Sequence, residues 1–249
     1  MHEFFCLNVG TGDLLIASAM AYMISELMHQ DVVLFVDSVP HFAKHVKNVH
    51  FSDSLEGELW SLARRKRKIQ QGEVDGKTNL WLEHHRGYYV DDKDDPLAAA
   101  ARIVKEYVNN CGIRKRVMKS RFADFVNIPT VDLAPIKSFN ATKVCLLPSI
   151  DYDTCSLVMS ARDIYGFYNP YTKKHSATVP GDDLEWAEAV ARSDIIVTSE
   201  PLSLLFFLLH LRDKKIVFFN CNAVKRISSS YVNVTSTQEL IKEIRDTKS

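Results

Sequence analysis

The residues best placed to do chemistry lie near the N-terminus, in the sequence Gly10-Thr11-Gly12-Asp13. An apolar run precedes them and a long helical pattern follows, so we expect a sharp turn from a strand into a helix, which glycine permits because it has no side chain. Asp13 then stands at the start of the helix, where the helix dipole stabilises a carboxylate. Such a carboxylate can simply cap the helix, or it can act as a general base that takes a proton from a substrate hydroxyl.

The same turn departs from the dinucleotide-binding motif. That motif reads G-x-G-x-x-G and turns bare helix amides toward a pyrophosphate. Here Leu15 occupies the position of the third glycine, and the carboxylate of Asp13 would repel a phosphate. An NAD(P)-dependent dehydrogenase or epimerase, using Gly10 and Gly12 with Asp37 on a ribose, therefore remains an alternative and not the first prediction.

Two later turns carry polar side chains where apolar, strand-like runs end. One follows the run 143–148 and the other ends the run 194–198. Hydroxyl side chains in the second turn can cap the helix expected after it, and the free amides of that helix would attract an anion such as a nucleotide diphosphate. An ordinary capping turn on a buried helix is the alternative. The candidate donor-binding residues are Ser149, Thr198, Ser199, Glu200 and Ser203.

A pair of acids follows the first of these turns. Asp151 and Asp153 spell D-x-D, and hard carboxylate oxygens suit Mg²⁺ or Mn²⁺. A motif of three residues often arises by chance, so these two are weak metal candidates. We predict that no metal and no other cofactor is required.

Basic residues gather in the first half of the chain. Arg64, Arg65, Lys66 and Arg67 form one run, and a second cluster begins at Arg114. Positive charge near a helix C-terminus usually forms a solvated face, yet two clusters in one half also indicate a polyanionic acceptor such as DNA or lipopolysaccharide. We assign Arg64–Arg67, together with Gly10, Thr11 and Gly12, to the acceptor side.

Composition limits the class of protein. The 249 residues include 31 basic and 31 acidic side chains, so net charge selects no partner. The five cysteines are scattered without a C-x-x-C pair, which argues against a disulfide framework or a zinc site and favours a reducing compartment. No apolar run is long enough to span a bilayer. We therefore expect a cytoplasmic protein that does not insert into membranes.

The order of elements predicts an α/β fold. Strand-like runs alternate with helical patterns, which is typical of parallel sheets covered by helices. The stretch 127–140 contains two prolines and little periodicity, so it is interpreted as a linker. We predict two Rossmann-like domains facing a cleft, 1–135 and 136–249; a single six-stranded sheet is the alternative. The strands are expected at 3–8, 32–37, 79–83, 143–148, 194–198 and 215–219, and the helices at 13–28, 54–70, 96–110, 114–126, 183–192, 201–211 and 237–247.

The Gly-Asp turn also carries a family resemblance. Together with the small-residue helix that contains Ala17, Ser18 and Ala19, it resembles the N-terminal signature of heptosyltransferase-like glycosyltransferases, which have the GT-B fold. The resemblance implies that Asp13 is the base that deprotonates the acceptor hydroxyl. Pro148-Ser149 is similar to the turn that faces the donor phosphates in that family. The turn 198–203 matches the family's donor turn in position, but its aspartate, glycine and histidine are replaced.

From these residues we predict an inverting glycosyltransferase. The second half would bind a nucleotide sugar such as a UDP-sugar, and the first half would present the acceptor hydroxyl to Asp13. The favoured acceptor is a hydroxymethylated DNA base, as in the DNA modification of bacteriophages. The alternatives are a lipopolysaccharide or saccharide acceptor, the NAD(P)-dependent enzyme described above, and a non-catalytic module that binds nucleic acid or a nucleotide.

Overall fold

The structure is a computed structural model of the whole chain, which divides into two compact units, Met1–Ile128 and Pro129–Ser249. The division lies at the start of the proline-containing stretch 127–140. The structure describes residues 1–7, 9–54, 73–74, 77–80, 96–117, 131, 142–161, 166–171, 177–199, 214–221 and 232–247.

The first unit is built on a five-stranded sheet in the order β3-β2-β1-β5-β4. Strands β1, β2, β3 and β5 are parallel, and β4 pairs antiparallel with β5. The strand expected at 79–83 lies earlier, because β5 ends at Asn79. The bounds are β1 His2–Cys6, β2 Val32–Val36, β3 Val49–Ser52, β4 Glu73–Val74 and β5 Lys77–Asn79.

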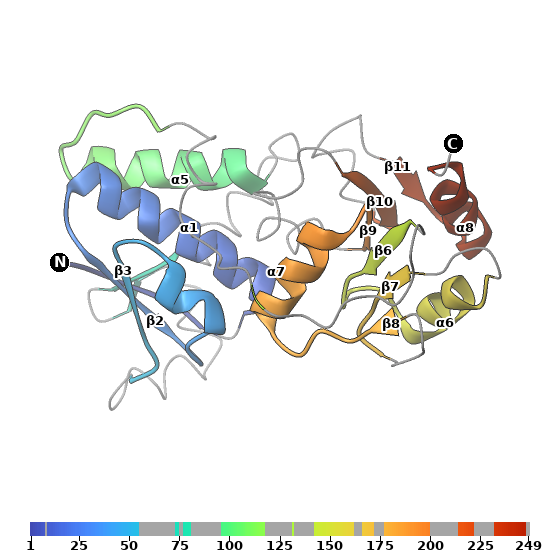
Figure 1. Ribbon diagram of the computed structural model, residues 1–249. Helices are drawn as coiled ribbons and strands as arrows, with labels where there is room; N and C mark the ends of the chain where they lie inside the picture. The colour runs from blue at the N-terminus through green and yellow to red at the C-terminus, as the bar shows by residue number, and fades with distance from the viewer. Residues whose placement is uncertain are drawn as a thin grey trace. The chain divides into compact units, whose positions relative to one another are not determined.

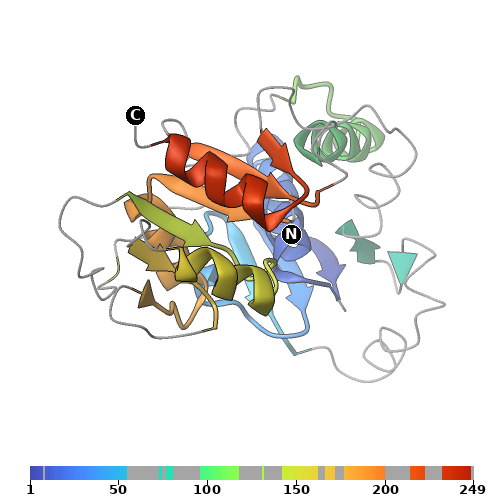
Figure 2. The same ribbon diagram turned by 90° about the vertical axis from the view of Figure 1, so that its right-hand side faces the viewer.

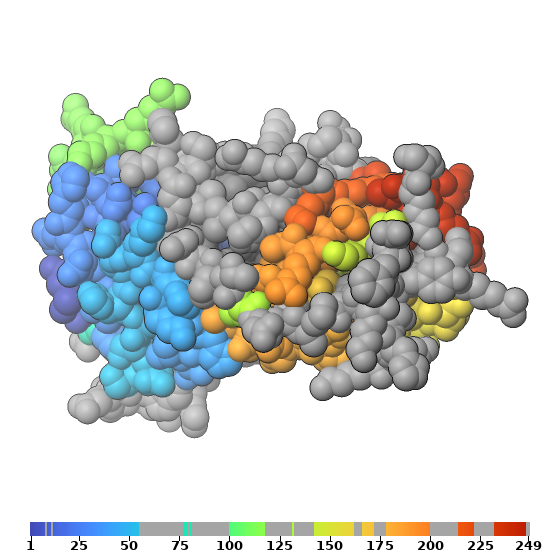
Figure 3. Space-filling model, in the orientation of Figure 1, coloured from blue at the N-terminus to red at the C-terminus, as the bar shows by residue number. Residues whose placement is uncertain are grey.

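The helix α1, Thr11–Met28, lies at the centre of this unit. Its residues from Leu15 to Ile24 are all buried, as expected for a helix covered on every side. The sheet covers one side of α1, and α5, Pro96–Asn110, lies alongside it (Figure 1). The short 3₁₀ helix η1, His41–His45, is at the surface of the unit (Figure 3).

The second unit contains a six-stranded parallel sheet in the order β11-β10-β9-β6-β7-β8. Its central strands are buried along their whole length, which explains why they form nearly continuous apolar runs in the sequence. The bounds are β6 Lys143–Leu146, β7 Gly166–Tyr168, β8 Ala177–Thr178, β9 Ile195–Thr198, β10 Lys215–Phe219 and β11 Val232–Val234.

Helices cover both faces of this sheet. Alternate strand residues such as Val144, Val197 and Val217 pack with side chains of α6, Tyr152–Ser160, and α8, Thr237–Asp246, in one core. These two helices lie side by side over that face (Figure 2). The helix α7, Asp183–Arg192, covers the opposite face (Figure 1). No helix in the described part of the chain is long and apolar enough to cross a membrane.

The predicted fold class, α/β with two parallel-sheet units, is confirmed. The helix expected at 114–126 is not formed at 114–117, and the rest of that range, like the helices expected at 54–70 and 201–211, lies outside the described residues. Lys115 instead serves another helix, since its Nζ donates to the carbonyl of Leu27, 3.2 Å away, in the last turn of α1. A cation at this end complements the helix dipole.

The turn at the C-terminus of α5 gives a prediction about backbone strain at Gly112. Gly112 has a φ of 80°, and the N–H groups of Gly112 and Ile113 donate to the carbonyls of Asn109 and Val108, as in a Schellman motif. No atom lies within 4 Å of a Cβ added to Gly112. We expect Gly112→Ala to lower the free energy of unfolding by about 1–2 kcal/mol through backbone strain alone, measured by denaturant titration. Cys111→Ala, an exposed neighbour, should be near neutral; equal stability of both variants would refute this interpretation of the turn.

Candidate functional site

The second sheet has one position at which its strand order reverses. The chain passes from β6 outward to β7 and β8, and then crosses back to β9 on the other side of β6. In open parallel sheets, ligands bind outside the carboxyl ends of the strands at such a switch point. Ser149 follows β6, while Thr198 and Ser199 lie at the end of β9. Both predicted donor turns therefore lie at this position.

Hydrogen bonds join the two turns directly. The hydroxyls of Ser149 and Thr198 are 2.9 Å apart, and the backbone N–H of Ser199 donates to Ser149 Oγ over 3.0 Å. Ser199 Oγ in turn donates to the carbonyl of Ser149 over 2.6 Å. We call these three residues the hydroxyl cluster. It connects segments about fifty residues apart in the sequence, so each turn fixes the conformation of the other.

Burial differs within the hydroxyl cluster. Thr198 is fully buried, whereas Ser149 and Ser199 are partly exposed. Thr198 therefore supports the turns from beneath, and the two serines stand at the surface where a ligand would meet them. Glu200 and Ser203, also predicted for the donor side, lie outside the described residues.

The first sheet has its own switch point, between β1 and β5. From β1 the chain passes outward to β2 and β3, and later returns to β5 on the other side. The Gly10 turn leaves the carboxyl end of β1, so the Asp13 turn lies at the corresponding position of this unit. Gly10 is the N-cap of α1 and provides no side-chain cap, and its carbonyl accepts the N–H of Leu14 over 3.0 Å.

Asp13 is the third residue of α1 and is half-buried. Its Oδ2 lies 3.9 Å from the point that a Cβ on Gly10 would occupy, so the carboxylate is directed back toward the start of the helix. Thr11 and Gly12 are the first two helical residues. The basic run Arg64–Arg67, the other part of the predicted acceptor side, lies outside the described residues.

The buried thiol of Cys6 reports on the charge at this edge. Burial raises its pKa well above the ordinary value, and the negative charges of Asp13 and Asp37 raise it further. Asp37 is exposed and follows β2, which pairs with β1 in a register that places Cys6 opposite Val36. Two carboxylates thus act on the carboxyl end of β1. This electrostatic environment suits a hydroxyl or a cation better than a phosphate.

The D-x-D pair is largely engaged in helix capping. Asp151 is the N-cap of α6, and its two carboxylate oxygens accept the N–H and the hydroxyl of Thr154, each over 2.8 Å. These hydrogen bonds lower the pKa of Asp151 below its ordinary value. Asp153 is exposed in the first turn of the same helix, where the dipole favours an acid. Capping therefore accounts for Asp151, and the helix dipole accounts for Asp153.

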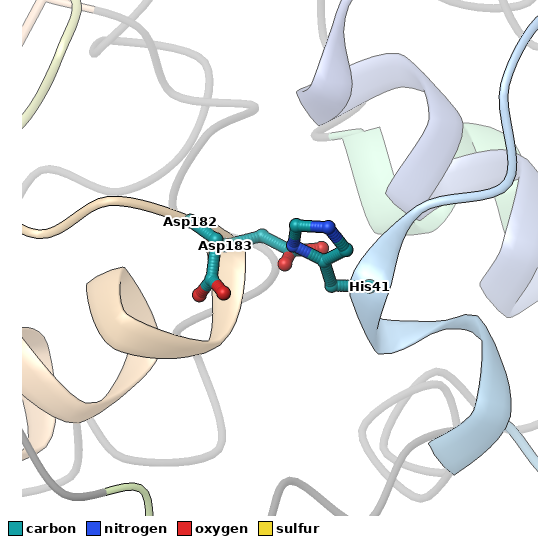
Figure 4. A group of neighbouring side chains, drawn as sticks. All are labelled: His41, Asp182 and Asp183. Atoms are coloured by element: carbon teal, nitrogen blue, oxygen red, sulfur yellow. The ribbon is translucent and has the colours of Figure 1, made fainter.

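Three other potential metal ligands do not share a unit. His41 opens η1 of the first unit, and Asp182 and Asp183 open α7 of the second (Figure 4). Asp182 caps α7 by accepting the N–H of Glu185 over 2.8 Å, and Asp183 accepts the N–H of Leu184 over 3.0 Å. These residues therefore form no metal site within either unit.

Sequence reasoning missed two tyrosines beside the hydroxyl cluster. The rings of Tyr152 and Tyr171 meet edge to face with centroids 5.6 Å apart. The Tyr171 hydroxyl donates to the carbonyl of Ile150 over 2.9 Å, and burial raises the pKa of this phenol above its ordinary value, so it stays a donor at neutral pH. Tyr152 stands between the two acids of the D-x-D pair, but Tyr171 lies nineteen residues later and only the fold brings it there.

The hydroxyl cluster generates a prediction on stability. Ser149→Ala removes the acceptor of the Ser199 N–H and a partner of the buried Thr198 hydroxyl. We expect the free energy of unfolding to fall by about 1–3 kcal/mol, measured by urea denaturation. Ser160→Ala is the matched control, because this exposed hydroxyl bonds only within α6 and its loss should cost about 0.5 kcal/mol or less. Similar losses in both variants would mean that the cluster does not hold the turns together.

The cap of α6 generates a prediction on pH. Because folding lowers the pKa of Asp151, the unfolded chain binds more protons in acid, and the stabilisation present at neutral pH is lost as the pH falls through the folded-state value. As the pH falls from 7 to 3, the free energy of unfolding should therefore decrease more in wild type than in Asp151→Asn. Denaturation at each pH measures both values. A difference that does not vary with pH would contradict the assignment of the cap.

No protein-family model and no curated protein sequence matches this chain. Several solved structures, however, resemble the structure of this chain. E. coli heptosyltransferase WaaC with ADP-2-deoxy-2-fluoro heptose aligns with a TM-score of 0.52 over 98% of this chain and 99% of that chain, at 11% identity. The same enzyme with ADP aligns with a TM-score of 0.51 over 99% and 100%, at 12% identity. A putative UDP-N-acetylglucosamine 2-epimerase from Listeria monocytogenes gives 0.48 over 98% and 87%, at 10% identity. The two alignments with TM-scores above 0.5 show that the chain has a GT-B-like fold of two parallel-sheet α/β units.

Proposed function

We propose that this protein is a nucleotide-sugar glycosyltransferase with Asp13 as its general base. The observation that carries the proposal is the placement of two sets of described residues, the Asp13 turn in the first unit and Ser149, Thr198 and Ser199 in the second. Each lies at the switch point of its own sheet, where α/β proteins bind ligands. One set presents a carboxylate and the other presents hydroxyls. The carboxylate can accept the proton of an acceptor hydroxyl, and the hydroxyls can donate hydrogen bonds to a diphosphate.

The donor is assigned to the second unit. The hydroxyl cluster provides a rigid polar surface there, and the structures with the same fold were solved with ADP or an ADP-heptose analogue. We extend that ligand class, a nucleoside diphosphate joined to a sugar, to this chain. The predicted base, uracil in a UDP-sugar, is one member of the class, and the assay below includes the others.

The acceptor hydroxyl is assigned to Asp13. Its carboxylate takes the hydroxyl proton while the acceptor oxygen forms a bond to the anomeric carbon. The bond from that carbon to the diphosphate oxygen breaks, and the electron pair leaves with the nucleoside diphosphate. Attack opposite the leaving group inverts the anomeric configuration. Transfer requires that the half-buried carboxylate stay within hydrogen-bond reach of the acceptor hydroxyl.

Hydroxymethylated DNA is the acceptor we propose to test first. The basic run Arg64–Arg67 belongs to the same unit as Asp13, and basic clusters bind the phosphates of nucleic acids. Lipopolysaccharide carries phosphates as well and is the second acceptor. An uncharged saccharide is the third, and it would leave the basic run without a role in acceptor binding.

The NAD(P)-dependent alternative meets an obstacle in the structure. Leu15, at the position of the third glycine, is 2% exposed and packs within the core of the first unit. A pyrophosphate at the Gly10 turn would also approach the carboxylates of Asp13 and Asp37, both of which act on Cys6. A non-catalytic binding module stays the second candidate, since the basic run alone would support it.

The test measures release of nucleoside diphosphate from a panel of nucleotide sugars, each with and without the three acceptors. We expect one donor to give acceptor-dependent release. Asp13→Asn should lower kcat by about 10²-fold or more, because it removes the base but keeps the shape of the side chain. Donor affinity should be unchanged. Asp31→Asn, an exposed acid just before β2, is the matched control and should retain full activity.

Three results would overturn all or part of the proposal. If no donor is turned over and none raises the unfolding temperature, the binding module becomes the better explanation. If turnover occurs but Asp13→Asn retains it, the chain is a transferase with a different base. Tight NAD binding that survives Asp13→Asn would instead support the dehydrogenase or epimerase.

A further inference from the structure

Exposed aromatic surface is concentrated beside the hydroxyl cluster. Of the large hydrophobic side chains that are exposed among the described residues, only Tyr152 and Tyr171 are aromatic, at 59% and 43% exposure. They contact one another edge to face. Folding normally buries rings of this size, so an exposed pair in contact calls for an explanation beyond the packing of the core.

The pair is held in place although it faces solvent. The hydroxyl of Tyr171 donates to the carbonyl of Ile150, the residue after Ser149, and its backbone N–H donates to Oδ1 of the fully buried Asn169 over 3.0 Å. Tyr152 is the first residue of α6, whose cap Asp151 is fixed by Thr154. Two rigid rings lose little conformational entropy when a ligand stacks on them.

The connections also place the pair at the switch point. Tyr152 is three residues beyond Ser149, and Tyr171 follows the neighbouring strand β7 by three residues. The hydrogen bond from Tyr171 to Ile150 ties the segment after β7 to the turn after β6. The tyrosines therefore lie beside the position assigned to the donor, toward β7, while the hydroxyl cluster lies toward β9.

The charge beside the two tyrosines indicates which kind of ligand can stack on them. Asp151 and Asp153 flank Tyr152 in the sequence, and both are exposed acids. Carboxylates repel phosphate, so the diphosphate would lie away from them, nearer the hydroxyl cluster. They accept hydrogen bonds from neutral groups, such as ribose hydroxyls or the amino group of a base. An aromatic face beside such acceptors matches a nucleoside.

We propose that Tyr152 and Tyr171 form a stacking platform for the nucleobase of the donor, an inference that rests on the proposed function. The base would lie against the exposed tyrosine rings, with its ribose toward the acids and its diphosphate toward Ser149. Stacking accepts any base, because every base has a π face, so the platform supplies affinity and leaves the choice of base to other contacts.

The test uses calorimetric titration of the full chain with ADP, UDP, GDP and CDP, and with inorganic pyrophosphate as the probe that lacks a base. We expect Tyr152→Leu and Tyr171→Leu each to weaken the tightest of the four diphosphates about tenfold or more. Pyrophosphate binding should stay as in wild type in both variants, and so should the thermal unfolding midpoint of Tyr152→Leu. Tyr171→Leu should lower the midpoint about as much as Tyr171→Phe does, because both lose the bond to Ile150. Tyr171→Phe keeps the ring but loses the bond to Ile150. It should therefore lose less affinity for the diphosphate than Tyr171→Leu does.

Leu157→Ala is the matched control. Leu157 lies on the same helix as Tyr152 and is similarly exposed, at 56%, but it has no ring for a base to stack on. We expect this variant to bind all five probes as wild type does. A loss equal to that of Tyr152→Leu would mean that general changes in α6, and not stacking, account for the effect, and would overturn the platform.

Other outcomes separate this inference from the proposed function. If both leucine variants bind the diphosphates as tightly as wild type, and wild type still releases diphosphate from a nucleotide sugar, the platform is wrong and the transferase stands. If the variants weaken a nucleotide sugar but not its diphosphate, the rings hold the sugar and the nucleobase assignment is wrong. If wild type binds none of the four diphosphates, both the stacking platform and the assignment of the donor to the second unit are wrong.

Discussion

The parallel pairing of β6 with β9 is the constraint on which the candidate donor site depends. The register places Leu146 opposite Val197, so the two strands end within one residue of each other and their turns lie at the same edge of the sheet. Only then can the Ser149 hydroxyl reach Thr198 and the N–H of Ser199. A shift of one residue would turn Thr198 to the other face of the sheet and separate the three groups.

Under the proposed function, each unit contributes a different part of the reaction. Each sheet has a single reversal of strand order among its described strands, and a turn lies at each reversal. The two turns carry different kinds of side chain. Around β1, Asp13 and Asp37 create a negative field that already acts on Cys6. Around β6, the groups of the hydroxyl cluster satisfy one another, and the exposed acids Asp151 and Asp153 lie on the side of Tyr152. Chemistry that needs a base in one place and a diphosphate in another suits such a pair.

The sequence predicted the features that depend on local pattern. The Gly10 turn, the long helix after it and the buried strands β6, β9 and β10 follow from apolar runs bounded by polar or small residues. Helix α6 was missed because its nine residues are short and follow a turn that drew attention only for its acids. The strands β7, β8 and β11 were missed for the same reason, since two or three residues carry too little periodicity.

Contacts between distant residues could not be predicted in this way. Nothing in the sequence near Tyr171 indicates that its hydroxyl meets the carbonyl of Ile150, and nothing near Lys115 indicates that it caps α1. Such contacts can be predicted only when the order of the strands in the sheet is known. By contrast, the turns after β6 and β9 could be singled out as candidates because polar side chains at the ends of buried strands are a local signal.

The central claim is that a nucleoside diphosphate binds at the β6–β9 switch point. Hydrogen–deuterium exchange of the full chain, with and without saturating nucleoside diphosphate, tests it most directly. We expect slower exchange at the backbone amides of residues 147, 149–152 and 197–199, with residues 9–14 unchanged. Protection confined to residues 9–14 would contradict the account, because it would place the nucleotide at the Gly10 turn as in a dinucleotide-binding enzyme.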